Sequence, residues 1–120
     1  MQYTKRILVV EDDIQRIRWF RDNLPADAEV HYIDIATRGV EFVKKNKYDM
    51  VFLDHDLGNI QGMDNTGYTV AKALSKTGNT STEVVIHSWN PIGARQMVEC
   101  LRSNGFNKVV ESRFGSFSIN

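Results

Sequence analysis

At 120 residues the chain has the length of one domain, and its 42% hydrophobic residues are enough to form a buried core. The 15 basic and 15 acidic side chains give a formal net charge of zero, which offers no electrostatic footprint for nucleic acid or an anionic membrane. No apolar run approaches the roughly 18 residues of a membrane span, and the single cysteine cannot form an internal disulfide. We expect one cytoplasmic domain over residues 1–120 that contacts neither nucleic acid nor membrane directly.

The chain alternates branched apolar runs with helical spacing, a pattern typical of βαβ units in a parallel sheet. Residues 7–10 predict a first strand that is covered on both faces. Apolar residues at 14, 17, 20 and 24 then recur at helical spacing, with Asp13 placed as the N-cap and Pro25 as the stop signal. A second strand is predicted over residues 30–35.

Further strand and helix units follow. Thr37 is the predicted cap of a short second helix, and the apolar residues 50–53 predict a third strand. A loop over residues 58–67, rich in Gly and Asn, is longer than most connections between a strand and a helix. The remaining elements are a third helix with Val70, Ala71 and Leu74 inward, a fourth strand over 84–86, a fourth helix capped by Asn90 with Pro91 at its first position, and a fifth strand at 109–110.

Acidic and imidazole side chains follow three of these strands where each strand ends. In a doubly wound parallel sheet of order 2-1-3-4-5, strands one and three are neighbours, and ligands bind outside the carboxyl ends of the strands. The side chains at that edge are Glu11, Asp12, Asp54, His55, Asp56, His87 and Ser88. We therefore expect Asp12 and Asp54 to converge into an acidic pocket, whereas Asp13 is expected only to cap its helix.

The expected acidic pocket predicts a metal ion, because neighbouring carboxylates cannot all stay ionised without a compensating cation. Oxygen ligands without a nearby cysteine favour a hard ion such as Mg²⁺, with Mn²⁺ as the other candidate. Such a metal would neutralise the oxygens of a phosphoryl group and let a carboxylate attack it. His87 belongs either to this pocket or to the core as a hydrogen-bonded histidine. Trp19 and Trp89 are expected to be packing residues.

Three segments make the chain resemble the receiver domain of two-component response regulators: ILVVEDD at 7–13, ATRGVEFV at 36–43 and YDMVFLD at 48–54. The resemblance runs in order from residue 6 to about residue 114. It implies a flavodoxin-like five-stranded sheet, with Asp54 as the phospho-accepting aspartate, Glu11 and Asp12 as the metal-binding pair, and Asp56 as a metal contact through its backbone carbonyl. Receivers also place Thr or Ser after the fourth strand, and here Ser88 and His87 are both candidates for that position.

The sequence departs from the receiver pattern at three places. The loop HDLGNIQGMDNTG after Asp54 is long and lacks the usual Met-Pro or Leu-Pro step. Ser112-Arg113 stands where receivers have a Lys-Pro pair whose lysine holds the phosphoryl group and signals its presence. The fifth helix is expected to be truncated or absent, because almost no sequence is left to form it.

Two further segments resemble a divergent receiver-like family that is proposed to process cyclic phosphates. They are DHDLG at 54–58 and HSWNPIGARQM at 87–97, and Thr66-Gly67 opens the third helix between them. The hallmarks of that family are His-Asp after the third strand and His-Ser-x-Asn after the fourth. This resemblance implies a phosphorylated or cyclic-phosphate small molecule as the substrate, such as a 2′,3′-cyclic phosphate end or a signal derived from a cyclic nucleotide.

Three functions remain open at this point. A metal-dependent phosphoesterase or phosphoryl-transfer enzyme would use His87 or His55 as general acid or base, and Ser88 and Asn90 to bind phosphate oxygens. A stand-alone receiver would be phosphorylated on Asp54 by a histidine kinase. A pseudo-receiver would be an interaction module without turnover. The retained acids disfavour the third function and the missing lysine disfavours the second, so the enzyme is preferred.

The C-terminal segment FGSFSIN is too short for a stable helix but carries Phe114, Phe117 and Ile119. An apolar sheet face needs cover, so these side chains are expected to fold back or to complete a neighbouring subunit. We expect a weak homodimer through this surface.

Overall fold

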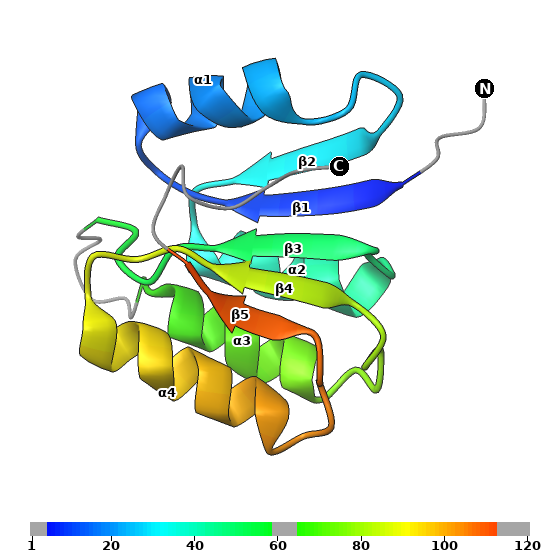
Figure 1. The fold of residues 1–120 in the computed structure, drawn as a ribbon, viewed down its shortest axis with the longest axis vertical. Helices are drawn as coiled ribbons and strands as arrows, with labels where there is room; N and C mark the ends of the chain where they lie inside the picture. Colours follow the sequence, from blue (N-terminus) through cyan, green and yellow to red (C-terminus); the bar gives the residue numbers. More distant parts are fainter. Residues whose placement is uncertain (1–4, 59–64, 113–120) are drawn as a thin grey trace.

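A five-stranded parallel sheet forms the centre of the computed structural model, which describes residues 5–58 and 65–112. The elements in chain order are β1 (Arg6–Val10), α1 (Ile14–Asn23), β2 (Glu29–Ile33), α2 (Ala36–Lys45), β3 (Met50–Leu53), α3 (Gly67–Ser75), β4 (Glu83–Ile86), α4 (Pro91–Arg102) and β5 (Val109–Glu111). The strands lie in the order β2-β1-β3-β4-β5, and every neighbouring pair is parallel (Figure 1). The predicted α/β class, flavodoxin-like topology and strand order are confirmed.

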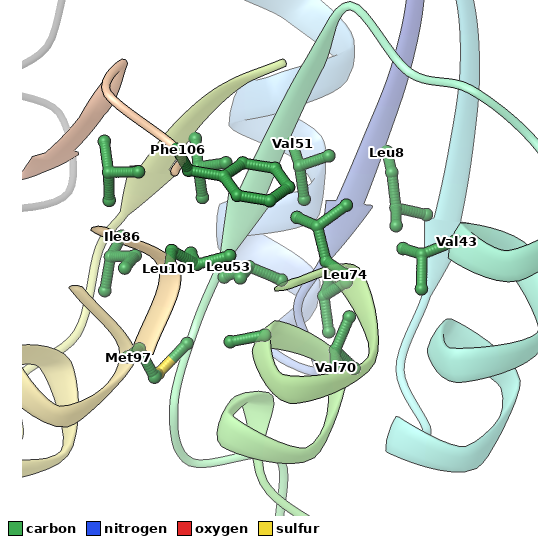
Figure 2. Packing of buried hydrophobic residues seen from close by; sticks show 14 of the residues in the cluster. Leu8, Val43, Val51, Leu53, Val70, Leu74, Ile86, Met97, Leu101 and Phe106 are labelled. Carbon is green, nitrogen blue, oxygen red and sulfur yellow. The ribbon is translucent and has the colours of Figure 1, made fainter. Parts of the chain in front are cut away.

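The helices divide between the two faces of this sheet, with α1 on one side and α2, α3 and α4 on the other (Figure 1). The larger core lies under α2, α3 and α4, where strand residues such as Leu8, Val51 and Ile86 are fully buried (Figure 2). The smaller core lies under α1 and consists of Ile7, Val9, Phe20, Leu24, Phe52 and Val85. Side chains along a strand alternate between the two faces of a sheet. A residue two positions after a strand residue of the smaller core therefore also faces α1.

The predicted helix caps are confirmed at two places. The Asp13 carboxylate accepts the backbone N–H groups of Gln15 and Arg16, and the Asn90 side chain accepts that of Gly93. Each cap satisfies N–H groups that have no partner within the helix. The two capped turns begin α1 and α4, both at the carboxyl edge of the sheet.

Three expectations for individual elements are wrong. Thr37 is not the cap of α2, which begins at Ala36 with Ile35 in the cap position and without a side-chain bond from that residue. The second strand ends at Ile33 rather than at 35, because the chain turns into α2 earlier than the apolar pattern indicates. Ile14 is 62% exposed, although its spacing had placed it on the buried face of α1.

The described residues form four helices, and none of these is long and apolar enough to cross a membrane. A fifth helix, truncated or not, would follow Ser112 and lies outside the described residues. The same holds for Phe114, Phe117 and Ile119, so the homodimer expected through that segment stays a prediction. Val110, the middle residue of β5, is 50% exposed.

Candidate metal and phosphoryl site

Four strand ends form one row at the carboxyl edge of the sheet. Glu11, Asp54, His87 and Ser112 each donate a backbone N–H to the carbonyl of the last residue of the neighbouring strand, over distances of 3.0, 3.1, 3.0 and 2.9 Å. Val9, Phe52 and Val85 lie two positions earlier and belong to the core under α1, so the side chains of Glu11, Asp54 and His87 also face α1. His87, rather than Ser88, therefore lies beside Asp54 at the end of β4.

Three acids at this edge of the sheet converge, as the sequence predicts for Asp12 and Asp54. Glu11, Asp12 and Asp54 each offer a carboxylate oxygen, and these three atoms lie within 4.8 Å of one another. Glu11 and Asp54 are only 1% and 4% exposed, whereas Asp12 is exposed to solvent. A set of carboxylate oxygens with one open side suits a hard divalent ion that keeps several of its water ligands. The donor set therefore fits a divalent metal ion.

Arg16, in the first turn of α1, contacts the same acids. Its Nε donates to Glu11 Oε1 over 2.7 Å, and its Nη2 donates to Glu11 Oε2 over 3.0 Å. Nη2 also lies 3.4 Å from Asp54 Oδ2. Sequence reasoning missed Arg16, because a basic residue near the start of a helix is common and the position of Glu11 relative to it depends on the turn between β1 and α1.

The environment of the acids shifts their protonation. Burial, reinforced by the neighbouring Glu11, raises the pKa of Asp54 to about 7, even though Arg16 acts in the opposite direction. Burial and Glu11 also raise the pKa of Asp12 above its ordinary value. For both carboxyl groups burial outweighs the opposing effect of Arg16, so additional positive charge would favour their ionised forms. A divalent cation at this site would supply that charge.

His87 forms the inner wall of the site, with a side chain that is 1% exposed. Its ring lies against Phe20, at a centroid distance of 5.4 Å, and its Nδ1 is 3.6 Å from Glu11 Oε1. Burial lowers the pKa of His87 to about 4, with Glu11 opposing the shift, so the imidazole is neutral near pH 7. His87 is therefore a buried histidine that also lies beside the acids, and its catalytic role stays a prediction.

The other predicted residues form a second group at the first turn of α4. His55 Nδ1 pairs with Asp56 Oδ1 at 2.8 Å, and Asn90 Nδ2 lies 3.5 Å from the same nitrogen. The backbone N–H of Asn90 donates to Ser88 Oγ over 3.1 Å. A Cβ at Gly93 would overlap the His55 ring, which shows how closely that ring packs on α4. The predicted site residues are thus divided between two adjacent groups.

A buried asparagine anchors the loop that leads away from β3. Asn65 Oδ1 accepts the backbone N–H of Ala36 over 2.8 Å, and Asn65 Nδ2 donates to the carbonyls of Leu57 and Gly58 over 2.8 and 3.4 Å. Gly58, at φ +84°, lies against Asp12, because a Cβ there would be 3.2 Å from Asp12 Oδ2. Asn65 thus supplies the missing cap of α2 and holds Leu57 and Gly58 beside the acids. An asparagine in a polar loop carries no signal that would have identified it.

The two tryptophans behave differently. Trp19 packs against the core under α1, as expected, with its ring edge-on to Phe20. Trp89 is 73% exposed, and its expected packing role is wrong, because the turn between β4 and α4 carries it away from both cores. Ile92 in the first turn of α4 is also 73% exposed.

Comparisons with known proteins match the fold and the sequence motifs. A family model described as "Cyclic-phosphate processing Receiver domain" matches residues 7–103. No curated protein sequence matches the chain significantly. One similar solved structure is a receiver domain from Methanospirillum hungatei, with a TM-score of 0.65 and 16% identity, covering 90% of this chain and 81% of that one. Another is the response regulator domain of CheB from Thermotoga maritima, with a TM-score of 0.63 and 25% identity, covering 95% of this chain and 82% of that one. A third is the receiver domain of a sensor histidine kinase from Pseudomonas aeruginosa, described with a magnesium ion in its active-site cleft. Its TM-score is 0.61 and its identity 17%, covering 95% of this chain and 87% of that one.

Proposed function

The chain belongs to the cyclic-phosphate processing receiver family, and we propose that it opens a cyclic phosphodiester at the acidic end of its sheet in a reaction that depends on Mg²⁺ or Mn²⁺. The observation that carries the proposal is the position of His87. A neutral, buried imidazole lies beside Asp54, at a position where a simple receiver switch would need a hydroxyl group. Acids for a metal and an imidazole for proton transfer are the parts that a hydrolytic reaction requires.

In this proposal Asp12 and Asp54 hold the metal, Glu11 lies beside them, and the backbone carbonyl of Asp56 is a further candidate ligand. The bound metal supplies positive charge to the non-bridging phosphate oxygens. Exposed Asp12 leaves the site open on one side for the substrate, while Glu11 and Asp54 form its floor.

Opening the ring requires one proton to move. The oxygen of a water molecule forms a bond to phosphorus, one P–O ester bond breaks, and the proton lost by the water ends on the released hydroxyl group. His87 is neutral near pH 7 and is therefore in the form that accepts the proton. Glu11 Oε1, at 3.6 Å from His87 Nδ1, stabilises the imidazolium that forms.

The second group orients the remainder of the substrate. Asp56 fixes the His55 ring through Nδ1, which leaves Nε2 as the nitrogen for hydrogen bonding or proton transfer. Asn90 uses Oδ1 to cap α4 and keeps its Nδ2 group as a donor, and Ser88 keeps its hydroxyl hydrogen. These donors suit the phosphate oxygens that do not face the acids.

The alternative is a stand-alone receiver that a histidine kinase phosphorylates on Asp54. The receiver fold and the acids favour it. The end of β5 disfavours it, because Ser112 stands where a receiver has the lysine that signals phosphorylation. A pseudo-receiver without turnover is disfavoured by the acids at the site, whose burial is costly if they serve no ligand.

Parallel incubations test the proposal. The protein is mixed with Mg²⁺, Mn²⁺ or a chelator, together with either a 2′,3′-cyclic mononucleotide or acetyl phosphate. The account predicts that the cyclic nucleotide is converted into a phosphomonoester only when the metal is present. Chromatography of the nucleotides measures this conversion. A phosphorylated protein detected by intact mass after acetyl phosphate, with the cyclic nucleotide left untouched, would support the receiver instead.

A further inference from the structure

Glu11 has little capacity left to bind a metal. Its Oε2 accepts the backbone N–H groups of Asp12 and Asp13 over 3.0 and 3.1 Å and the Arg16 Nη2 group over 3.0 Å. Its Oε1 accepts Arg16 Nε over 2.7 Å, and the side chain is 0% exposed. A carboxylate offers about four lone-pair positions, so these four hydrogen bonds nearly saturate it. Glu11 is built to hold Arg16.

Asp54 and Asp12 are engaged differently. The Arg16 Nη2 to Asp54 Oδ2 distance of 3.4 Å exceeds the usual range for an N–H···O bond, about 2.7–3.2 Å. Asp12 is exposed and lies against Gly58. A metal can therefore replace the weak contact to Asp54 while the strong pair between Arg16 and Glu11 remains.

The guanidinium of Arg16 is anchored by Glu11, and the Arg16 side chain as a whole is partly accessible to solvent. Its side chain is 23% exposed, although it lies over two buried carboxylates. Within residues 5–58 and 65–112 it is the only Lys or Arg side chain that pairs with Glu11 or Asp54. A planar guanidinium binds phosphate oxygens through two parallel hydrogen bonds, which a lysine cannot reproduce.

We propose that Arg16, positioned by Glu11, binds the phosphoryl oxygens of the ligand, while Asp12 and Asp54 hold the metal. The inference rests on the proposed handling of a phosphoryl group at this site. It makes Glu11 a positioning residue and gives the site a cation from α1.

The test separates anion binding from metal binding. Inorganic phosphate is titrated calorimetrically into the protein at saturating Mg²⁺, and Mn²⁺ affinity is measured without phosphate by electron paramagnetic resonance of the free ion. Arg16→Met should weaken phosphate binding about 10- to 100-fold, the range of charge-assisted hydrogen bonds, and leave Mn²⁺ binding equal or tighter. Arg16→Lys should restore part of the phosphate affinity, because it keeps the charge but not the fork. Arg18→Met, an exposed arginine of the same helix, is the matched control and should change neither affinity.

Arg16→Met leaves the buried Glu11 charge uncompensated, so a second pair keeps the test valid if that variant does not fold. Glu11→Gln is compared with Glu11→Gln/Arg16→Met, and the second change should again weaken phosphate binding. Unchanged phosphate affinity without Arg16, loss of Mn²⁺ affinity in Arg16→Met, or no phosphate binding by the wild type would overturn the inference. Phosphate binding that depends on Arg16, without any turnover of a cyclic phosphate, would contradict only the proposed function.

Discussion

Asp54 and His87 lie side by side at the ends of β3 and β4, where the His87 backbone N–H donates to the carbonyl of Leu53, the residue before Asp54, over 3.0 Å. Burial shifts their pKa values in opposite directions, to about 7 for Asp54 and about 4 for His87. Both groups are thus driven toward their neutral forms. This pair of shifts makes the stability of the metal-free protein depend on pH in a way that single variants can separate.

The Asp54→Asn variant should gain stability over the wild type as the pH rises. The raised pKa of Asp54 means that the folded protein binds its proton more tightly than the unfolded chain, so ionisation destabilises the fold between about pH 4 and pH 7. The advantage of the variant should grow by about 1 kcal/mol per pH unit over that window. Urea unfolding in a chelating buffer measures it. A constant difference across the window would show that the Asp54 carboxyl is not shifted.

His87→Gln should show the opposite trend. The lowered pKa of His87 means that the unfolded chain binds the proton more tightly, so the wild type loses stability as the pH falls from about 6.5 to about 4. The variant lacks this loss, and its stability relative to the wild type should improve on acidification. Urea unfolding under the same conditions decides the sign, and a relative loss at low pH would contradict the neutral imidazole.

His87→Ala should reduce turnover of a 2′,3′-cyclic mononucleotide by about 10²–10⁴-fold, the usual contribution of a general acid or base. Mn²⁺ affinity should persist, because the residues that could hold the metal are carboxylates and do not include His87. His31→Ala is the matched control, since His31 is partly buried on β2 and its Nδ1 lies 2.6 Å from the Tyr48 hydroxyl. If His87→Ala has a lower melting temperature but an unchanged turnover number, His87 is a core residue without a catalytic role.

Gly93→Ala should separate activity from stability at α4. Alanine favours a helix by up to about 1 kcal/mol over glycine, but its Cβ would displace the His55 ring. We expect turnover to fall while the melting temperature holds or changes by only a few degrees. In a His55→Ala background the same change should cost no further activity, and an equal loss in both backgrounds would mean that Gly93 acts independently of His55.

Asn65→Ala should destabilise the protein by about 1–3 kcal/mol, because it leaves the buried N–H of Ala36 and the carbonyl of Leu57 without their partner. It should also weaken Mn²⁺ binding, since Gly58, whose carbonyl Asn65 binds, lies against Asp12. Asn104→Ala, which removes an exposed bond to the Cys100 carbonyl, is the control and should stay within about 0.5 kcal/mol. Equal stability losses in the two variants would contradict the anchoring role.

The sequence predicted the features of the fold and of the site that depend on local patterns of residues. Apolar runs and caps at Asp13 and Asn90 located the elements, and the parallel order brought Asp12 and Asp54 together. Choosing between His87 and Ser88 required the register of β4 on β3, because a shift of one residue exchanges the two faces.

Contacts between distant segments were not predictable in the same way. Arg16 reaches Asp54, 38 positions away, only once β1 and β3 pair, and Asn65 caps α2 from 29 positions away. The exposure of Trp89 depends on the direction of one turn, which hydrophobicity alone does not determine.

Phosphorus NMR of one reaction tests the central claim most directly. A 2′,3′-cyclic mononucleotide is incubated with Mg²⁺ and either the wild type or Asp54→Asn. The account predicts that the wild type converts the cyclic diester signal into that of a phosphomonoester, and that the variant, with its fold intact, does not. An unchanged cyclic signal with the wild type, or equal conversion by both proteins, would contradict it.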